Sequence, residues 1–385
     1  MVTNLQEYFL QLVRLGIGTS NDVKIPKDID WVALKALAER QGLTAVVLDG
    51  IDRVQEFNGS SVQDSMPQML RLEWIGEVLQ NYEERYRQYE KAIGSLAGFY
   101  NAHGFKMMVL KGYACSLDWP KSEHRPCGDI DIWLFGKQKE ADAALEAWFK
   151  GSKVQGFKID GSHHHHTVFE WQGFTVENHY DFVNVHAHNS SKELEKTFKE
   201  LGDVSHIDNK ENISIPKSTK ITSVLVHGEK VYLPSPDLHA LFLIKHMVSH
   251  FAAAQITLRQ LLDWAFFVEK NGKDVDWEWL MTVLEKYHMK DFFNLINAIC
   301  VDDLGFRVDM FPTVQFLPEL KDRVLADILE PAYGTAEPRG FFKRMTYKYR
   351  RWQGNAWKQR LCYDESRWSA FWSGVWGHLL KPKSI

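Results

Sequence analysis

Apolar positions along residues 1–104 recur at the three- and four-residue spacing of amphipathic helices. We therefore expect mostly helical structure there: a short helix at 7–15, helix from Asp28 to Ile51, a polar loop at 54–66, and a long helix from about Pro67 towards Gly104. The same spacing returns over 236–330. Two helix starts look alike, because Asp30 and Asp276 each stand before a tryptophan at a position typical of an N-cap.

Between residues 105 and 233 the apolar pattern changes to the period of two that is typical of strands. We expect short strands at 105–110 and 129–134, a helix at 138–150, and hairpins that turn at Gln172-Gly173 and His227-Gly228. Strands bracketed by helices indicate an α+β fold. The chain divides accordingly into an N-terminal helical region (1–95), a core (96–235) and a C-terminal helical region with a basic, aromatic tail (236–385).

Composition places the chain among globular proteins. It has 385 residues, of which 45% are hydrophobic and 25% charged, and a formal net charge of -4. These values suggest two or three domains and argue against wholesale disorder and against a dedicated nucleic-acid binder. The four cysteines are scattered, the start is a poor signal peptide, and no apolar run approaches the ~18 residues of a membrane span, so we expect a cytoplasmic protein.

The most informative segment contains Gly128-Asp129-Ile130-Asp131 at the start of an apolar strand. Residues i and i+2 of a strand point to the same face, so Asp129 and Asp131 project together. Two adjacent carboxylates repel each other, and folds seldom juxtapose them without a cation. Oxygen-rich sites of this kind suit Mg²⁺, which positions triphosphate oxygens.

The alternative for a bare Asp-x-Asp pattern is an edge strand with two solvated acids. The surrounding residues favour a phosphate site. Gly128 permits close approach of the backbone, Lys111-Gly112 closes the preceding strand, and Arg125 supplies a cation just upstream.

Several motifs in order carry a family resemblance. They are Leu110-Lys111-Gly112, Arg125-Pro126-Cys127-Gly128-Asp129-Ile130-Asp131, Glu177-Asn178-His179, the pair His246 and His250, and Leu258-Arg259-Gln260-Leu261-Leu262-Asp263. Together they resemble a group of uncharacterised bacterial nucleotidyltransferases within the DNA polymerase β-like nucleotidyltransferase superfamily, over roughly residues 85–300.

The resemblance implies a small mixed β-sheet bearing three carboxylates. Asp129 and Asp131 would bind Mg²⁺ or Mn²⁺, and Glu177 would be the third carboxylate. The strand period independently places Glu177, His179 and Asp181 on one face, so Asp181 is a rival for the third position. His179 would contact phosphate or orient an acid.

The implied reaction is metal-dependent transfer of a nucleoside monophosphate from an NTP to an acceptor hydroxyl, with release of pyrophosphate. One feature departs from the superfamily, whose turn usually offers a small hydroxyl residue. Here the turn is Lys111-Gly112-Tyr113, which gains a lysine as the expected phosphate contact. The departure favours an alternative, a non-catalytic or toxin–antitoxin-type nucleotide-binding protein on the same fold.

Four residues are expected near the acceptor, whose identity the sequence does not specify. His246 and His250 share a helix face, and lining a cleft is a better interpretation than zinc binding because no HExxH motif is present. Arg259 and Asp263, also four apart, are expected to form an ion pair within the helix.

Two further segments invite a functional interpretation. The run His163-His164-His165-His166 is expected to be an exposed strand entry with alternating faces, where only adventitious metal binding would occur. Residues 339–360 carry eight Lys/Arg and no acid, and we expect a helical pair that packs its aromatics and solvates its charges, in preference to a nucleic-acid site.

Overall fold

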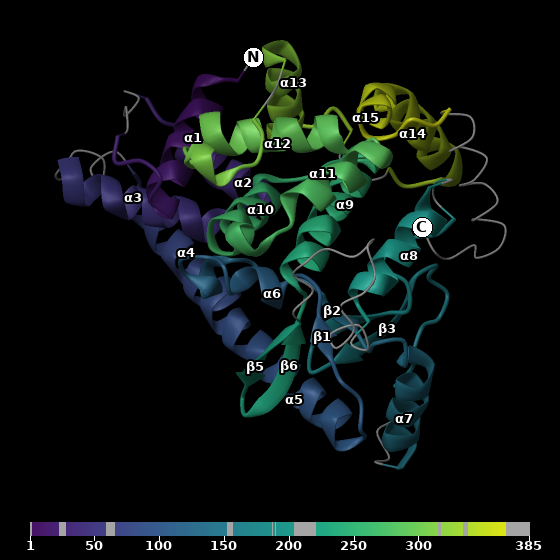
Figure 1. Cartoon of the computed structure of the whole chain (residues 1–385). Helices are drawn as coiled ribbons and strands as arrows, with labels where there is room; N and C mark the ends of the chain where they lie inside the picture. Colours follow the sequence, from purple (N-terminus) through teal and green to yellow (C-terminus); the bar gives the residue numbers. More distant parts are fainter. Residues whose placement is uncertain are drawn as a thin grey trace.

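The computed structural model describes residues 2–22, 28–58, 66–151, 157–186, 188, 190–203, 221–314, 317–333 and 338–366. Helices at both ends of the chain flank one mixed sheet, so the predicted α+β class is confirmed (Figure 1). The expected run of histidines and the basic tail both fall largely within these residues. The boundaries of the three predicted regions remain predictions.

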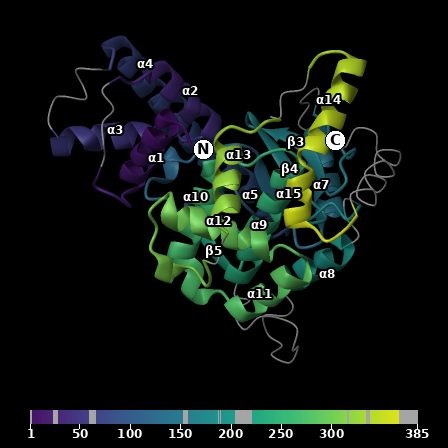
Figure 2. The ribbon, with the colours of Figure 1, turned by 90° about the horizontal axis from the view of Figure 1, so that it is seen from above.

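The N-terminal residues form a helical layer at one side of the molecule (Figure 2). Its helices are α1 (Asn4–Ile17), α2 (Trp31–Gln41), α3 (Thr44–Asn58) and α4 (Gln68–Val78). The stretch expected as helix from Asp28 to Ile51 is two helices, because Gly42 adopts φ +66° and ends α2. The expected loop at 54–66 was wrong at its start, since α3 continues to Asn58.

The long helix expected from Pro67 is confirmed as a continuous run. It begins with α4, passes through a six-residue π-helical segment (Leu79–Glu84), and continues as α5 (Arg85–Ala102). Gly104 follows its end with φ +78°, as a helix terminator does. Helix α5 packs against the last two strands of the sheet and so connects the N-terminal helices to the core.

The sheet has the strand order β3-β4-β2-β1-β6-β5 among the described residues. Its strands are β1 (Met108–Val109), β2 (Ile130–Trp133), β3 (His166–Trp171), β4 (Phe174–His179), β5 (Thr222–Val226) and β6 (Glu229–Leu233). Both predicted hairpins are confirmed. Their turns, Gln172-Gly173 and His227-Gly228, have positive φ at both positions, which matches the right-handed twist of the strands.

Two pairings in this sheet set the positions of polar residues. Strand β2 runs antiparallel to β1 and parallel to β4. The β2–β4 register places Asp131 directly beside Glu177, and Trp133 beside His179. Strand β4 pairs in turn with β3, where His166 lies opposite His179. Residues from three separate sequence segments are therefore gathered at one end of the sheet.

The helices of the C-terminal half lie beyond that end of the sheet, with α9 nearest to it (Figure 1). They are α9 (Pro236–Ala253), α10 (Leu258–Asn271), α11 (Trp277–Lys286), α12 (Lys290–Asp302), α13 (Pro318–Leu329), α14 (Phe341–Gly354) and α15 (Ala356–Cys362); the short α6 (Tyr113–Ser116), α7 (Gln138–Gly151) and α8 (Ser191–Leu201) lie between strands. The N-cap roles of Asp30 and Asp276 are confirmed by their side-chain hydrogen bonds to the backbone. None of the described helices combines the length and apolarity needed to cross a bilayer.

The hydrophobic core consists of two clusters. One joins the N-terminal helices to α9–α13, and the other lies between the sheet, α5 and α7. The expected helical pair in the basic segment is confirmed, but the expectation that its aromatics pack and its charges are solvated was wrong for several residues. In α15, Lys358 is 1% exposed and pairs with Asp327, whereas Phe342 and Tyr349 of α14 are exposed.

A buried ion pair ties the core segment to α10. Two guanidinium nitrogens of Arg125 donate to the carboxylate of Asp263, with Nε–Oδ1 at 2.7 Å and Nη2–Oδ2 at 2.9 Å. The indole of Trp119 donates to the same Oδ1 at 2.9 Å. Burial disfavours the charge on Arg125, but Asp263 outweighs it and raises the pKa of the guanidinium. The pair is geometrically bidentate, the strongest form of this interaction.

We predict that Asp263→Asn lowers the free energy of unfolding by about 3–5 kcal/mol, because it leaves the Arg125 charge buried without compensation. Urea denaturation followed by circular dichroism measures the loss. Asp181→Asn is the matched control, since Asp181 pairs with a half-exposed lysine and its loss should cost less than about 1 kcal/mol. Equal losses in the two variants would contradict a clamping role for Asp263.

A second prediction concerns Gly112, which follows β1 with φ +62°. A Cβ there would lie 2.5 Å from the Tyr89 hydroxyl, which donates to the backbone oxygen of Asp129 at 2.9 Å. Gly112→Ala should therefore cost about 1–3 kcal/mol more than Gly136→Ala, which has a similar φ but open space at its Cβ. Denaturant titration of both variants gives the difference, and similar values would show that Tyr89 moves aside freely.

Candidate active site

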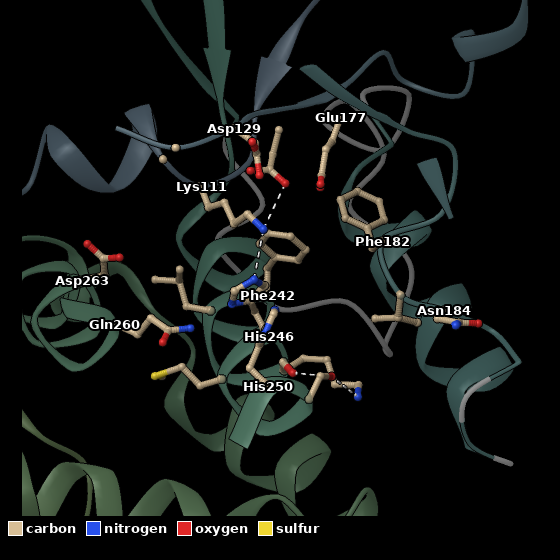
Figure 3. Close-up of a pocket in the computed structure, with 18 of the residues that line it drawn as sticks. Lys111, Asp129, Glu177, Phe182, Asn184, Phe242, His246, His250, Gln260 and Asp263 are labelled. Atoms are coloured by element: carbon tan, nitrogen blue, oxygen red, sulfur yellow. Dashed lines mark hydrogen bonds and ion pairs between the residues drawn. The ribbon is translucent and has the colours of Figure 1, made fainter. Parts of the chain in front are cut away.

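A cavity of ≈ 670 Å³ lies between the end of the sheet and helices α9 and α10. Figure 3 shows Asp129 and Glu177 on the sheet side and His246 and His250 on the helix facing them. The lining residues combine carboxylates, cations and imidazoles with apolar side chains such as Phe242. Such a mixture of an apolar enclosure and convergent polar groups is typical of a binding or active site.

The sheet supplies three carboxylates to the cavity wall. Asp129 precedes β2, Asp131 lies on it, and Glu177 lies beside Asp131 on β4. The shared direction of Asp129 and Asp131, with Ile130 buried on the other face, follows from the strand period. Oxygens of Asp131 and Glu177 come within 4.8 Å of each other and of a His179 nitrogen.

Asp181, the rival for the third carboxylate position, does not reach the cavity. Strand β4 ends at His179, so the period of two no longer applies two residues later. The Asp181 carboxylate instead pairs with Lys199 on α8. The structure therefore brings Glu177, and not Asp181, to Asp129 and Asp131.

Two side chains compensate the charge of Asp131, whose side chain is only 1% exposed. Lys111 Nζ lies 3.1 Å and His179 Nε2 3.2 Å from Asp131 Oδ1. Burial disfavours ionised Asp131, but Lys111 and His179 outweigh it and hold the pKa of the carboxyl below its usual range. In turn, contacts with Asp131 and Glu177 overcome burial and raise the pKa of His179 to about 9.

Asp129 differs from its neighbour because no described residue forms an ion pair with it. Burial, followed by the nearby charges of Glu177 and Asp131, raises the pKa of its carboxyl. The Tyr89 hydroxyl holds the Asp129 backbone in place but leaves the side chain facing the cavity. Gly128 precedes it with open space where a side chain would lie.

One of the predicted cleft histidines, His246, contacts Lys111. His246 Nε2 lies 3.0 Å from Lys111 Nζ, and its ring centroid lies 4.3 Å from that of His250. Burial, and then Lys111, lowers the pKa of both imidazoles, to about 4 for His250. A neutral His246 accepts a hydrogen bond from the ammonium group. The predicted shared face of the two histidines is confirmed.

The expected ion pair between Arg259 and Asp263 was wrong. Both carboxylate oxygens of Asp263 are taken by Arg125, which arrives from a distant loop. Arg125 borders the cavity, but its guanidinium is paired with Asp263. Arg259 also lines the cavity and has no acidic partner within 4.0 Å among the described residues. Burial, followed by the nearby Arg125 charge, lowers the pKa of Arg259.

The histidine run is not an exposed strand entry. Only His166 belongs to β3; the residues before it form bends, so their faces do not alternate. His164 and His166 are 6% and 7% exposed, and His165 and His166 line the cavity. Nδ1 of His165 and Nδ1 of His166 are buried without a hydrogen-bond partner in the described structure. Burial lowers the pKa of His166 to about 4, so its ring is neutral.

Several lining residues were not foreseen, among them Lys245 and Tyr363. Lys245 on α9 donates to Ser249 Oγ at 2.8 Å and to Tyr363 Oη at 3.1 Å, and burial lowers its pKa to about 8. The sequence signal that could have identified Lys245 is its place as the single lysine in the apolar stretch of α9. Tyr363 comes from the segment after α15 and stacks on His188, with ring centroids 3.7 Å apart. No local pattern marks that residue.

Comparison with known proteins adds one match. A family model described as an uncharacterised nucleotidyltransferase matches residues 27–304, a range that contains every lining residue discussed above except Tyr363. No curated protein and no solved structure matches the chain. Because the matched range covers more than half of the sequence, the chain belongs to this family of uncharacterised nucleotidyltransferases.

Proposed function

We propose that the protein transfers a nucleoside monophosphate from an NTP to an acceptor hydroxyl within the cavity, with release of pyrophosphate, as a member of the polymerase β-like superfamily. Family membership implies an NTP substrate. The observation that supports the reaction most strongly is the alignment of Asp131 with Glu177 beside Asp129, at the wall of a cavity that also contains Arg259.

The donor set fits a divalent cation. Asp129 carries a carboxylate without an ion-pair partner among the described residues, and the two neighbouring acids add further negative charge. Asp129, Asp131 and Glu177 would hold the ion, since Mg²⁺ and Mn²⁺ prefer carboxylate oxygens. When bound, such an ion neutralises triphosphate oxygens and favours ionisation of the attacking hydroxyl.

The cations of the chain bind the triphosphate in this proposal. Arg259 has a charge that no acid satisfies in the described structure, and a guanidinium matches two phosphate oxygens at once. Lys111 pairs with Asp131, and its ammonium group would be available for phosphate if a divalent cation were held by the carboxylates. His246, which contacts Lys111 Nζ, holds that ammonium group at the cavity side of the turn.

Proton transfer falls to Glu177. Its side chain is 23% exposed, against 1% for Asp131, so an acceptor hydroxyl can reach its carboxylate oxygens. A carboxylate at hydrogen-bond distance from the attacking hydroxyl serves as a general base. The α9 wall of the cavity, with His250, Lys245 and Phe242, would select the acceptor.

A nucleotide-binding protein without turnover is the second candidate function. The observation favouring it is the contact between Lys111 and Asp131, because the lysine supplies the positive charge that a metal ion would supply. Magnesium-dependent NTP binding without pyrophosphate release in any acceptor screen would support this candidate over transfer.

We predict that Asp129→Asn and Asp131→Asn each reduce transfer at least 10³-fold, measured as pyrophosphate release with radiolabelled NTPs and cell extract as the acceptor source. The two substitutions should have different effects on the free energy of unfolding. Asp129→Asn relieves repulsion and should not destabilise the metal-free fold. Asp131→Asn removes the acid that pairs with Lys111 and one of the two acids that face His179, and it should cost about 3 kcal/mol.

Asp181→Asn is the matched control for both variants, because its carboxylate follows the neighbouring strand β4 but lies outside the cavity. It should retain wild-type turnover. If Asp129→Asn kept full activity, the carboxylates would not carry the reaction.

Arg259 provides a separate prediction. Arg259→Ala should weaken binding of Mg²⁺–NTP by about 1.5–3 kcal/mol, the usual contribution of a hydrogen bond to a charged group. Calorimetric titration measures the affinity, with Arg40→Ala as the control for loss of an exposed arginine outside the cavity. Unchanged affinity in Arg259→Ala would remove the residue from the triphosphate site.

A further inference from the structure

Three imidazoles meet at the edge of the cavity beside the carboxylates. They belong to His165, His166 and His179, and one ligand nitrogen of each lies within 4.8 Å of the others. The ring centroids of His165 and His166 are 4.4 Å apart. The His179 ring centroid lies 5.5 Å from that of His165 and 5.2 Å from that of His166. The antiparallel pairing of β3 with β4 holds His166 opposite His179, so the grouping rests on regular backbone structure.

Two of these rings each have a nitrogen without a hydrogen-bond partner in the described structure. Nδ1 of His165 and Nδ1 of His166 are buried and accept or donate no hydrogen bond within the described part of the chain. His166 is more than nine-tenths buried. Buried polar atoms are normally satisfied, so an orphaned pair of nitrogens in one cluster points to a ligand.

The third ring is oriented as metal-bound histidines usually are. Its Nδ1 lies 3.2 Å from the backbone oxygen of Asp181, which can only accept a hydrogen bond. That contact keeps the proton on Nδ1 and directs Nε2 towards the cluster and the Asp131 and Glu177 carboxylates. A carbonyl partner on the distal nitrogen fixes the ring and the tautomer of a ligating histidine.

We propose that His165, His166 and His179 form a binding site for a divalent transition-metal ion of the zinc type. Imidazole favours such ions, whereas carboxylate clusters favour magnesium, so this site differs in ligand chemistry from the Asp129–Asp131–Glu177 group, with which it shares Glu177. Glu177, with Oε1 3.9 Å from His166 Nε2, provides a neighbouring oxygen ligand. The site does not depend on the proposed transfer reaction.

The nitrogens must draw together to bind the ion. Zinc–nitrogen distances of about 2.0–2.1 Å place tetrahedral ligands about 3.4 Å apart. The three nitrogens lie within 4.8 Å of one another in the structure, so they would have to move closer. The backbone oxygen of His165 accepts hydrogen bonds from the amides of Tyr180 and Asp181, so its nitrogen would approach the ion by rotation of the side chain alone. Bound metal would also replace the proton on His179 Nε2 as the positive charge facing Asp131.

The test uses the full chain freed of metal and titrated with ZnCl₂ alone, without nucleotide, by calorimetry; the visible absorption of Co²⁺ substituted at the site gives a second readout. Wild type should bind one equivalent. His166→Ala and His165→Gln should each weaken zinc binding at least tenfold and lose the Co²⁺ absorption. Thermal melting of the metal-free variants shows whether they are folded; His165 is half-buried, so its substitution should disturb the fold little.

Two controls make the assignment specific. His163→Ala removes a histidine of the same run whose ring stacks on His166 but which lies outside the three-residue group, and it should weaken zinc binding less than His166→Ala does. Asp129→Asn should also keep zinc while losing transfer, so failure of the transfer proposal leaves this site unaffected. Absence of zinc binding in wild type, or equal losses in His163→Ala and His166→Ala, would overturn the proposal.

Discussion

The buried carboxylate of Asp131 is the constraint on which the site depends. A charge with 1% exposure persists only where opposite charges compensate it. The sheet order provides this compensation, because β2 lies between β4, which carries His179, and β1, which leads into Lys111. A cation therefore reaches Asp131 from each neighbouring strand, and the carboxylate stays ionised at the cavity wall.

The helices extend the same charge pattern across the cavity. His246 on α9 contacts Lys111, so the cation that compensates Asp131 is itself held from the opposite wall. The bidentate pair between Arg125 and Asp263 fixes α10 against the segment that leads into β2. Because Arg125 occupies both oxygens of Asp263, Arg259 is left facing the cavity with its charge available. Within the described structure, the ion pair thus leaves Arg259 without an acidic partner, as the proposed function requires.

Local sequence patterns predicted the parts of this arrangement that depend on backbone periodicity. The period of two placed Asp129 and Asp131 together, and glycine-containing turns located both hairpins. Tertiary partners were not predictable: Asp263 pairs across 138 residues of sequence with Arg125, in preference to the residue one turn away. The burial of His165 likewise depends on bends before β3, where neither strand nor helix periodicity applies.

The central claim is that the three sheet carboxylates and Arg259 form one nucleotide–metal site. Crystals grown with Mn²⁺ and a non-hydrolysable NTP analogue test it most directly through the anomalous scattering of manganese. The account predicts an anomalous peak in contact with Asp129, Asp131 and Glu177, with the triphosphate extending to Arg259. Nucleotide bound elsewhere on the protein, with no manganese at these carboxylates, would contradict it.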